Sequence, residues 1–302
     1  MKNSNKMIKT SMILIVLGLF ICGAAFFMIS FDLTKLSTVS FRTETFEIND
    51  DFTDINIHTQ IEDIILLPSD DGKCSVVCTL AENAAAEASV NGDCLIIETD
   101  GSKRRNWFLN ISSQDSGIRV YLPDTEYKNL SVKTDTGDTE IPKDFIFETA
   151  IIEANTGDTD YSASVSNGLC IKTNTGDVSL SGLNTGSAEI TLTTGDITLS
   201  SVTGGDITLG TSTGEIELDD SVFSGDMRIK TGSGDITFDK CDAANMYIST
   251  GTGDIEGSFL SDKKFNAKTK TGDVEIPASS DGGICEISSS TGDINIKIEK
   301  TR

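Results

Sequence analysis

The chain has 302 residues, of which 37% are hydrophobic and 6% aromatic, and its formal net charge is -23. That hydrophobic share excludes a chain that stays disordered, and the acidic excess argues against nucleic acid as a partner, because a negative surface repels phosphate groups. Threonine, serine, glycine, aspartate and isoleucine dominate the composition, as is typical of β-strands separated by turns. We therefore expect an all-β protein.

Residues 10–31, "TSMILIVLGLFICGAAFFMISF", carry no charge and are long enough for a helix of about 20 residues to cross a bilayer. Lys2, Lys6 and Lys9 precede them, so the positive-inside rule leaves residues 1–9 in the cytoplasm. A cleaved signal peptide is the alternative, with "CGAA" at 22–25 as its cleavage site, but the apolar run continues beyond it. We predict an uncleaved transmembrane signal-anchor helix, which makes this a single-pass protein of the cell membrane with an extracytoplasmic C-terminal domain.

Residues 32–125 contain short apolar segments that we interpret as an N-terminal β-strand cap region. Candidate strands are "DFTDINI", "EDIILLP", "CSVVCTL" and "IRVYLP", and Asn91-Gly92 in "ASVNGDCLIIET" is a two-residue hairpin signal. The segment "SKRRNWF" at 102–108 is the only basic cluster beside an aromatic pair. Two interpretations of it stay open: docking onto an anionic wall polymer or the membrane surface, and a loop whose rings pack on the cap.

From residue 126 to residue 302 a Thr-Gly-Asp motif recurs every 19 or 20 residues. Seven and five positions before its glycine, and two and four positions after it, the residues are mostly apolar, which predicts two strands joined by a bend at the glycine. A fixed period near 20 residues is typical of stacked repeats. We therefore expect a parallel β-solenoid, or β-helix, of about nine 19-20-residue coils. The glycines of the motif are Gly137, Gly157, Gly176, Gly195, Gly214, Gly234, Gly253, Gly272 and Gly292.

Two further features concern the shape of the coils and the end of the stack. A weaker glycine-acid pair, "TGGD" at 203–206 and "FSGD" at 223–226, lies half a period away and predicts a second corner in each coil. The chain finishes with "INIKIEKTR", whose Lys297, Lys300 and Arg302 are expected to keep an open solenoid edge from pairing with another chain.

An acidic residue follows each motif glycine, and stacking in register predicts a ladder of carboxylates. Neighbours about 4.8 Å apart repel, so solvent, a hydrogen bond in the turn or a cation must compensate. The hydrogen-bonded turn is the main interpretation; calcium is the alternative metal and the only cofactor considered. The threonine or serine before each glycine is expected to form a ladder of hydroxyl hydrogen bonds. The acids are Asp138, Asp158, Asp177, Asp196, Glu215, Asp235, Asp254, Asp273 and Asp293.

The sequence carries no catalytic constellation and no cofactor-binding motif. His58 is the only histidine, so no Ser-His-Asp triad is available, and there is no Walker loop, dinucleotide fingerprint or HExxH. Six cysteines outside the anchor are scattered without metal-ligand spacing, and we expect most of them to be small buried hydrophobic residues whose disulfide state stays open. They are Cys74, Cys78, Cys94, Cys170, Cys241 and Cys285.

Nearly the whole chain resembles the bacterial putative adhesin family, a domain of unknown function with TGD-containing β-strand repeats that includes LiaG-like membrane-anchored proteins. The segments that carry the resemblance are the N-terminal anchor with "FDLTKLS", "LPSDDGKCSVVC", "YLPDTEYKNLSVKTDTGDTEIPKDF" and "CDAANMYISTGTGDIEGSFLSDKKF". The resemblance implies a membrane-anchored surface protein without a known enzymatic activity. It implies no site residues.

These observations favour a non-enzymatic, membrane-anchored extracytoplasmic β-repeat protein that acts as an adhesin or a cell-envelope interaction module. Its partner would be a cell-envelope or surface ligand. The alternative is an envelope-stress accessory protein whose partner is another membrane protein. A polysaccharide-active β-helix enzyme is the third hypothesis and the weakest, because the coils carry few of the aromatic platforms on which sugars stack.

Overall fold

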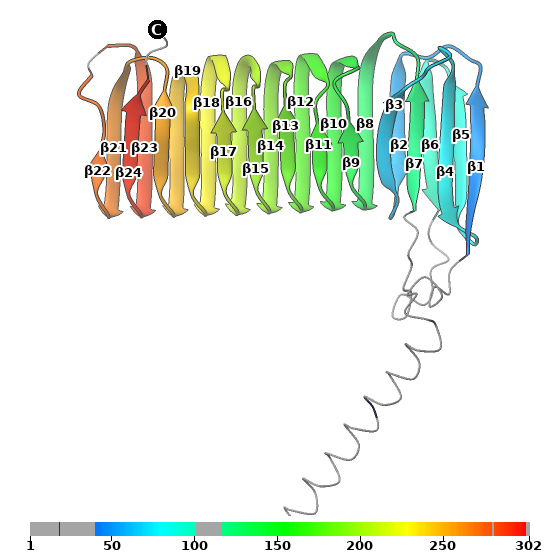
Figure 1. Cartoon of the computed structure of the whole chain (residues 1–302), viewed down its shortest axis with the longest axis horizontal. Helices are drawn as coiled ribbons and strands as arrows, with labels where there is room; N and C mark the ends of the chain where they lie inside the picture. Colours follow the sequence, from blue (N-terminus) through cyan, green and yellow to red (C-terminus); the bar gives the residue numbers. More distant parts are fainter. Residues whose placement is uncertain (1–17, 19–39, 101–115, 280, 300–302) are drawn as a thin grey trace, which may run out of the picture.

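The computed structural model describes residues 18, 40–100, 116–279 and 281–299 (Figure 1). Except for Gly18, the anchor predicted over 10–31 lies outside the described residues, as does the basic cluster at 102–108. In the described part of the chain, no helix has the length and hydrophobicity needed to cross a bilayer.

The described chain from residue 40 onward folds into two sheets that face each other across one core, as the composition predicted. In the repeat region each coil contributes one long and one short strand, so we call the two faces the long-strand sheet and the short-strand sheet. The cap region contributes β1 (Phe41–Ile48), β2 (Asp54–Thr59), β3 (Asp63–Pro68), β4 (Cys74–Ala81), β5 (Ala85–Asn91), β6 (Cys94–Asp100) and β7 (Gly117–Leu122).

In the repeat region every pairing between strands is parallel. The long-strand sheet contains β8 (Glu126–Thr136), β10 (Ile146–Thr156), β12 (Ser164–Thr175), β14 (Asn184–Thr194), β16 (Thr203–Thr213), β18 (Val222–Ser233), the second half of β19 (Ile236–Thr252), β23 (Gly283–Thr291) and β21 (Lys263–Thr271), in that order. The short-strand sheet contains β9 (Thr139–Ile141), β11 (Thr159–Tyr161), β13 (Val178–Ser181), β15 (Ile197–Ser200), β17 (Ile216–Asp219), the first half of β19, β20 (Ile255–Phe259), β24 (Ile294–Ile298) and β22 (Val274–Glu275). This arrangement is the predicted parallel β-solenoid, with about eight turns between its nine glycine corners.

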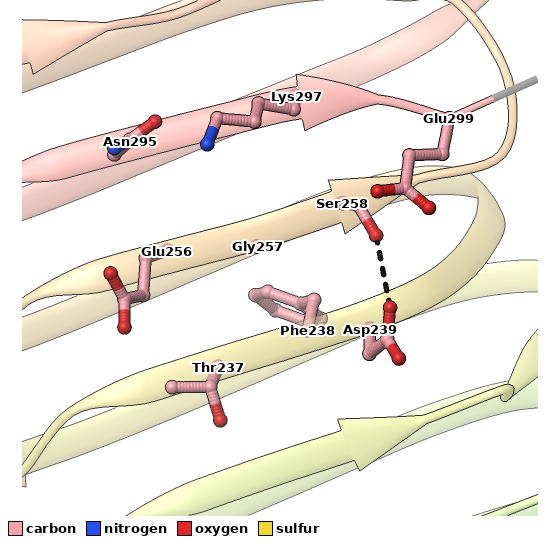
Figure 2. Close-up of a pocket in the computed structure, with 9 residues that line it drawn as sticks. All are labelled: Thr237, Phe238, Asp239, Glu256, Gly257, Ser258, Asn295, Lys297 and Glu299. Carbon is pink, nitrogen blue, oxygen red and sulfur yellow. Dashed lines mark hydrogen bonds between the residues drawn. The ribbon is translucent and has the colours of Figure 1, made fainter.

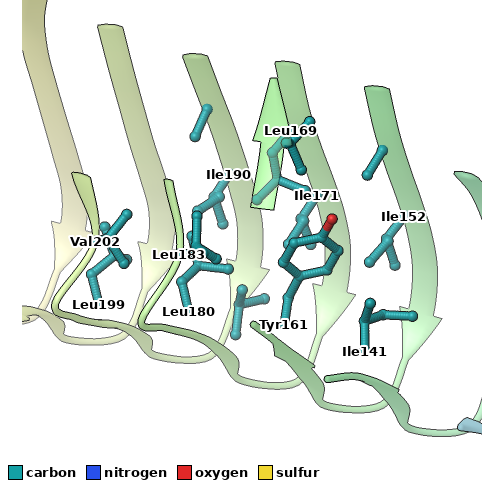
Figure 3. Close-up of a cluster of buried hydrophobic side chains, with 14 of the residues drawn as sticks. Ile141, Ile152, Tyr161, Leu169, Ile171, Leu180, Leu183, Ile190, Leu199 and Val202 are labelled. Atoms are coloured by element: carbon teal, nitrogen blue, oxygen red, sulfur yellow. The ribbon is translucent and has the colours of Figure 1, made fainter. Parts of the chain in front are cut away.

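The core fills the space between the two sheets, and it is built from the apolar positions of the repeat. Figure 3 shows Ile152, Ile171 and Ile190 of the long strands pointing toward the row that holds Tyr161 and Leu180 of the short strands. Because every coil places the same positions inward, successive coils bury each other's apolar faces and no coil needs a core of its own. The period-two interpretation is confirmed.

Both ends of the stack depart from chain order. The coil formed by β2 and β3 precedes β4 to β7 in sequence, yet it lies between β6 with β7 on one side and β8 with β9 on the other. At the other end, β23 and β24 insert between β19 with β20 and β21 with β22. Figure 1 shows β21 and β22 as the last coil of the rod.

The insertion at the C-terminal end corrects the prediction about the open edge. Lys297 belongs to β24, which pairs with β20 and β22 on its two sides and is therefore no edge, while Lys300 and Arg302 lie outside the described residues. The edge is the coil of β21 and β22, and β21 carries the exposed Lys264, Lys268 and Lys270. Charge protects the edge as expected, but on a different strand.

The second corner also lies elsewhere than predicted. It falls at Gly182, Ser201, Asp220 and Lys240, where φ is 62°, 56°, 44° and 49°. The "TGGD" and "FSGD" segments instead lie in β16 and β18, where the strand registers shift and form bulges. The prediction failed because serine, aspartate and lysine, as well as glycine, adopt the left-handed conformation at this corner. The sequence therefore has no repeating glycine at the position of the second corner.

Candidate functional site

The first corner of each coil, at the motif glycine, admits no other residue. All nine glycines have φ between 133° and 151°, a region closed to L side chains. In addition, a Cβ atom at any of them would lie 1.9–2.4 Å from a backbone carbonyl oxygen of the adjacent coil. The backbone conformation and the close contact with the adjacent coil therefore each require glycine at these positions.

The acids after these glycines form the predicted ladder, but their hydrogen bonds run between coils. The Oδ1 atom of one acid accepts a hydrogen bond from the backbone N–H of the next acid along the stack at 2.7–2.9 Å. For example, the N–H of Asp177 donates to Asp158, and the N–H of Asp196 donates to Asp177. Each carboxylate thus supplies an acceptor for an N–H that has no carbonyl partner at the corner. The prediction of a bond within each turn is corrected accordingly.

The ladder begins one coil earlier than the motif, and it has one interruption. Asp63, in the coil of β2 and β3, accepts the N–H of Asp138 at 2.9 Å, although "IEDI" contains no glycine that would have revealed it. Glu215 donates its N–H to Asp196, but within the described residues it accepts none from Asp235. The longer glutamate side chain explains the missing hydrogen bond, because at all the other rungs an aspartate side chain spans the distance to the next N–H.

A second set of hydroxyls, missed from the sequence, lies inside the corner. Three positions before the glycine, Thr211, Thr231 and Thr250 donate to the carbonyl oxygen of the previous corner glycine at 3.0–3.2 Å, and Thr269 and Ser289 do the same. The threonines immediately before the glycines are exposed, and among the described residues their hydroxyls do not bond to one another. The predicted hydroxyl ladder is therefore wrong in position. The sequence did contain a signal for these hydroxyls, because a threonine or serine recurs three positions before the glycine, where the side chain points inward.

The nine predicted acids line up along one edge and do not converge on a point. Within the described ranges, no group of three or more His, Cys, Asp and Glu side chains is placed to hold a metal ion. Calcium binding along the ladder stays a prediction.

A hollow of about 340 Å³ lies near the C-terminal end of the short-strand sheet (Figure 2). Here β20 has Gly257 at the position where other coils bury Leu218 or Phe238. Gly257 has a φ of 140°, and a Cβ there would lie 2.0 Å from the carbonyl oxygen of Phe238. The "IEGSF" segment could have revealed this bulge. The hollow is lined by Thr237, Phe238, Asp239, Glu256, Gly257, Ser258, Asn295, Lys297 and Glu299.

Some of the polar groups of this hollow are already hydrogen-bonded to one another and to the backbone. Ser258 accepts the backbone N–H of Lys240 at 2.9 Å and bonds Asp239 at 3.4 Å, the contact drawn in Figure 2. No imidazole activates the Ser258 hydroxyl, since His58 lies in β2 at the other end of the stack. Three carboxylates and one lysine leave the hollow with acceptors for hydroxyl or ammonium groups.

Comparison with known families agrees with this architecture. The family described as Toastrack DUF4097 matches residues 52–238 and 220–302, which is most of the chain. The chain belongs to the Toastrack DUF4097 family. This confirms the resemblance to a TGD-repeat domain of unknown function. No functionally curated protein matches.

Several solved structures are similar to this Toastrack chain. A putative adhesin from Bacteroides fragilis is 19% identical, with 87% of this chain and 99% of that one covered and a TM-score of 0.43. A putative lipid binding protein from Parabacteroides distasonis is 16% identical, with 86% and 98% covered and a TM-score of 0.49. A putative adhesin from the same species is 11% identical, with 86% and 98% covered and a TM-score of 0.47.

The cysteines of the Toastrack coils and cap are free thiols. Cys74, Cys78, Cys241 and Cys285 are buried, as predicted, and burial raises the pKa of each thiol to about 12. A thiol with so high a pKa is a poor nucleophile at neutral pH. Cys94 and Cys170 are half-buried, which agrees with the prediction that most, but not all, of the cysteines are buried. These side chains therefore pack the core or the sheet and add no reactive site.

Proposed function

We propose that this protein is a non-enzymatic, membrane-anchored, extracytoplasmic module that binds a cell-envelope or surface ligand, as an adhesin does. The observation that carries the proposal is the geometry of the stack. The coils bury most of their apolar residues in the core and present two largely polar outer sheets and an acidic edge, with shallow hollows between side chains. Such a surface suits contact along its length, in which many weak contacts add up.

The anchor at residues 10–31 is supported by the sequence. It is uncharged over its whole length and follows three lysines, as expected of a signal anchor. The described chain starts beside the cap, and the coil of β21 and β22 lies at the opposite end of the rod (Figure 1). An anchor before the cap would therefore hold the C-terminal coils farthest from the membrane.

The absence of enzymatic activity is supported by the chemistry of the described side chains. The buried thiols are protonated at neutral pH, Ser258 has no imidazole beside it, and the acids stand in a row instead of facing each other across a cleft. General acid-base catalysis requires groups that converge on a substrate. Nothing in this arrangement provides such a pair.

Two measurements test the proposal. First, the full chain expressed with a C-terminal tag should stay in membranes after carbonate washing, and protease added outside the cell should remove the tag. A variant lacking residues 10–31 provides the control. Second, the full chain in neutral detergent should co-sediment with purified cell envelopes. A chain found in the cytosol, or one that never binds envelopes, contradicts the proposal and directs the search to a membrane-protein partner.

A further inference from the structure

The outer face of the long-strand sheet differs in charge from the rest of the molecule at its C-terminal end. On β18, β19, β23 and β21 the exposed cations are Arg228, Lys230, Lys264, Lys268 and Lys270. The described carboxylates on the same face are those of Asp226, Glu286 and, where the strands start, Asp242, which pairs with Lys263. A chain whose net charge is -23 thus carries a local cationic patch, bounded at the strand ends by the corner acids.

A hollow of about 200 Å³ lies within this patch. Its lining includes Ser249 and Ser288, which are neighbours in register, and the same row of the sheet continues to Lys230 on one side and Lys268 on the other. Three strand spacings separate the two lysines, a distance of roughly 14 Å between their backbones. Tyr247, Glu286 and Asn266 form the adjacent row, which makes the wall of the hollow.

The aromatic wall is held in place by its neighbours. The Arg228 guanidinium lies over the Tyr247 ring, 5.0 Å from its centroid, and forms an ion pair with Asp226 at 2.8 Å. Asn245 donates a hydrogen bond to the other oxygen of Asp226 at 2.9 Å. A ring fixed in this way loses little side-chain entropy when a ligand stacks on it.

The same rows in the first coils of the repeat lack these features. In those coils Lys133 forms an ion pair with Glu153 at 3.7 Å. The positions equivalent to Tyr247 are occupied by Ser131 and Ile151. Lys230 and Lys268 form no ion pair with any described residue. Lys230 and Lys268 therefore have no ion pair to give up when a ligand binds, whereas Lys133 has Glu153 beside it.

We propose that this patch binds an anionic polysaccharide, with Tyr247 as the platform for a sugar ring and Lys230 and Lys268 as partners for its carboxylate or phosphate groups. The inference rests on the proposed function and names its ligand class. A glycan fits better than a lipid surface, because a hollow with an aromatic wall accommodates a ring and a bilayer is flat. The coils involved are also those farthest from the cap.

Binding of matched polymers to the immobilised full chain in neutral detergent tests the proposal. The probes are phosphomannan with uncharged mannan, and polygalacturonate with its methyl ester, so that each pair differs only in its anionic groups. We expect the anionic member of at least one pair to bind, with an affinity that falls steeply with salt. The pair that responds tells phosphate from carboxylate.

Matched variants locate the contact. The double variant Lys230→Gln, Lys268→Gln should bind about tenfold more weakly, while the control Lys133→Gln, Lys172→Gln changes the net charge equally and should retain affinity. Tyr247→Leu should weaken binding without changing the thermal unfolding temperature. Equal losses in both double variants, equal binding of the uncharged polymers, or binding to phosphatidylglycerol vesicles with no effect of Tyr247→Leu would overturn the proposal. If no anionic polymer binds but envelopes are still retained, this inference fails and the proposed function stands.

Discussion

Replacing a corner glycine tests whether close contact between coils, in addition to backbone conformation, holds the stack together. Gly195→Ala and Gly182→Ala form a comparison pair: both glycines have positive φ, at 140° in a region closed to L side chains and at 62° in the left-handed region that some L residues adopt. A Cβ on Gly195 would lie 2.0 Å from the carbonyl oxygen of Gly176, whereas a Cβ on Gly182 meets nothing within 4 Å. Serine, aspartate and lysine already occupy the positions equivalent to Gly182 in later coils.

The expected magnitudes follow from these contacts. Gly182→Ala should lower the free energy of unfolding by about 1–2 kcal/mol, the cost of a left-handed L residue. Gly195→Ala combines a strained backbone, about 1–3 kcal/mol, with overpacking of about 1–3 kcal/mol, so its loss should be roughly 2–6 kcal/mol. Urea unfolding of the full chain, followed by far-ultraviolet circular dichroism, measures both. Equal losses in the two variants would refute the claim that contact between coils restricts the corner.

Three further predictions concern single side chains. Asp177→Ala should cost about 1 kcal/mol in urea unfolding, because the N–H of Asp196 loses its acceptor, while Asp177→Asn keeps an oxygen there and should cost less. Tyr161→Phe should leave stability unchanged or raise it by about 1 kcal/mol, since the buried Tyr161 hydroxyl has no partner among the described residues; a loss would show that the hydroxyl is satisfied in solution. Above pH 9, unfolded thiols lose protons that Cys241 and Cys285, with pKa values of about 12, keep in the fold, so stability should fall as the pH rises toward 12. Replacing both cysteines by alanine should reduce that fall in the urea midpoint.

The periodic part of the fold was predictable because two independent rules coincide at each corner. Apolar residues at every second position identify the inward side chains. At each motif glycine the inward positions change from odd to even offsets, which requires the chain to bend there. The second corner was predicted at the wrong place because Ser201, Asp220 and Lys240 adopt positive φ without a glycine. Asp63 was missed for a related reason, since it stands at the start of the ladder without the motif.

The order of the end coils was not predictable, because every coil presents the same inward pattern and would stack on any other. The structure shows what distinguishes them. Lys263, which is buried at the start of β21, reaches past β23 to Asp242 at 2.5 Å and to the carbonyl oxygen of Ala243 at 2.7 Å. Gly283 of β23 lies where a Cβ would be 1.7 Å from the carbonyl oxygen of Ala244, so the inserted strand passes closely beneath this link.

This link ties the outermost coil of the rod to β19 across the inserted strand. A buried ammonium group needs partners, and Lys263 finds them in Ser261 before its own strand and in Asp242 and Ala243 of β19, two strands away in the sheet. Chain-order stacking would place β21 directly on β19 and leave β23 and β24 as the open edge. The insertion instead puts the lysine-rich β21 outermost, where its charges both protect the edge and border the hollow at Tyr247. One topological choice therefore serves solubility and supplies part of the proposed binding surface.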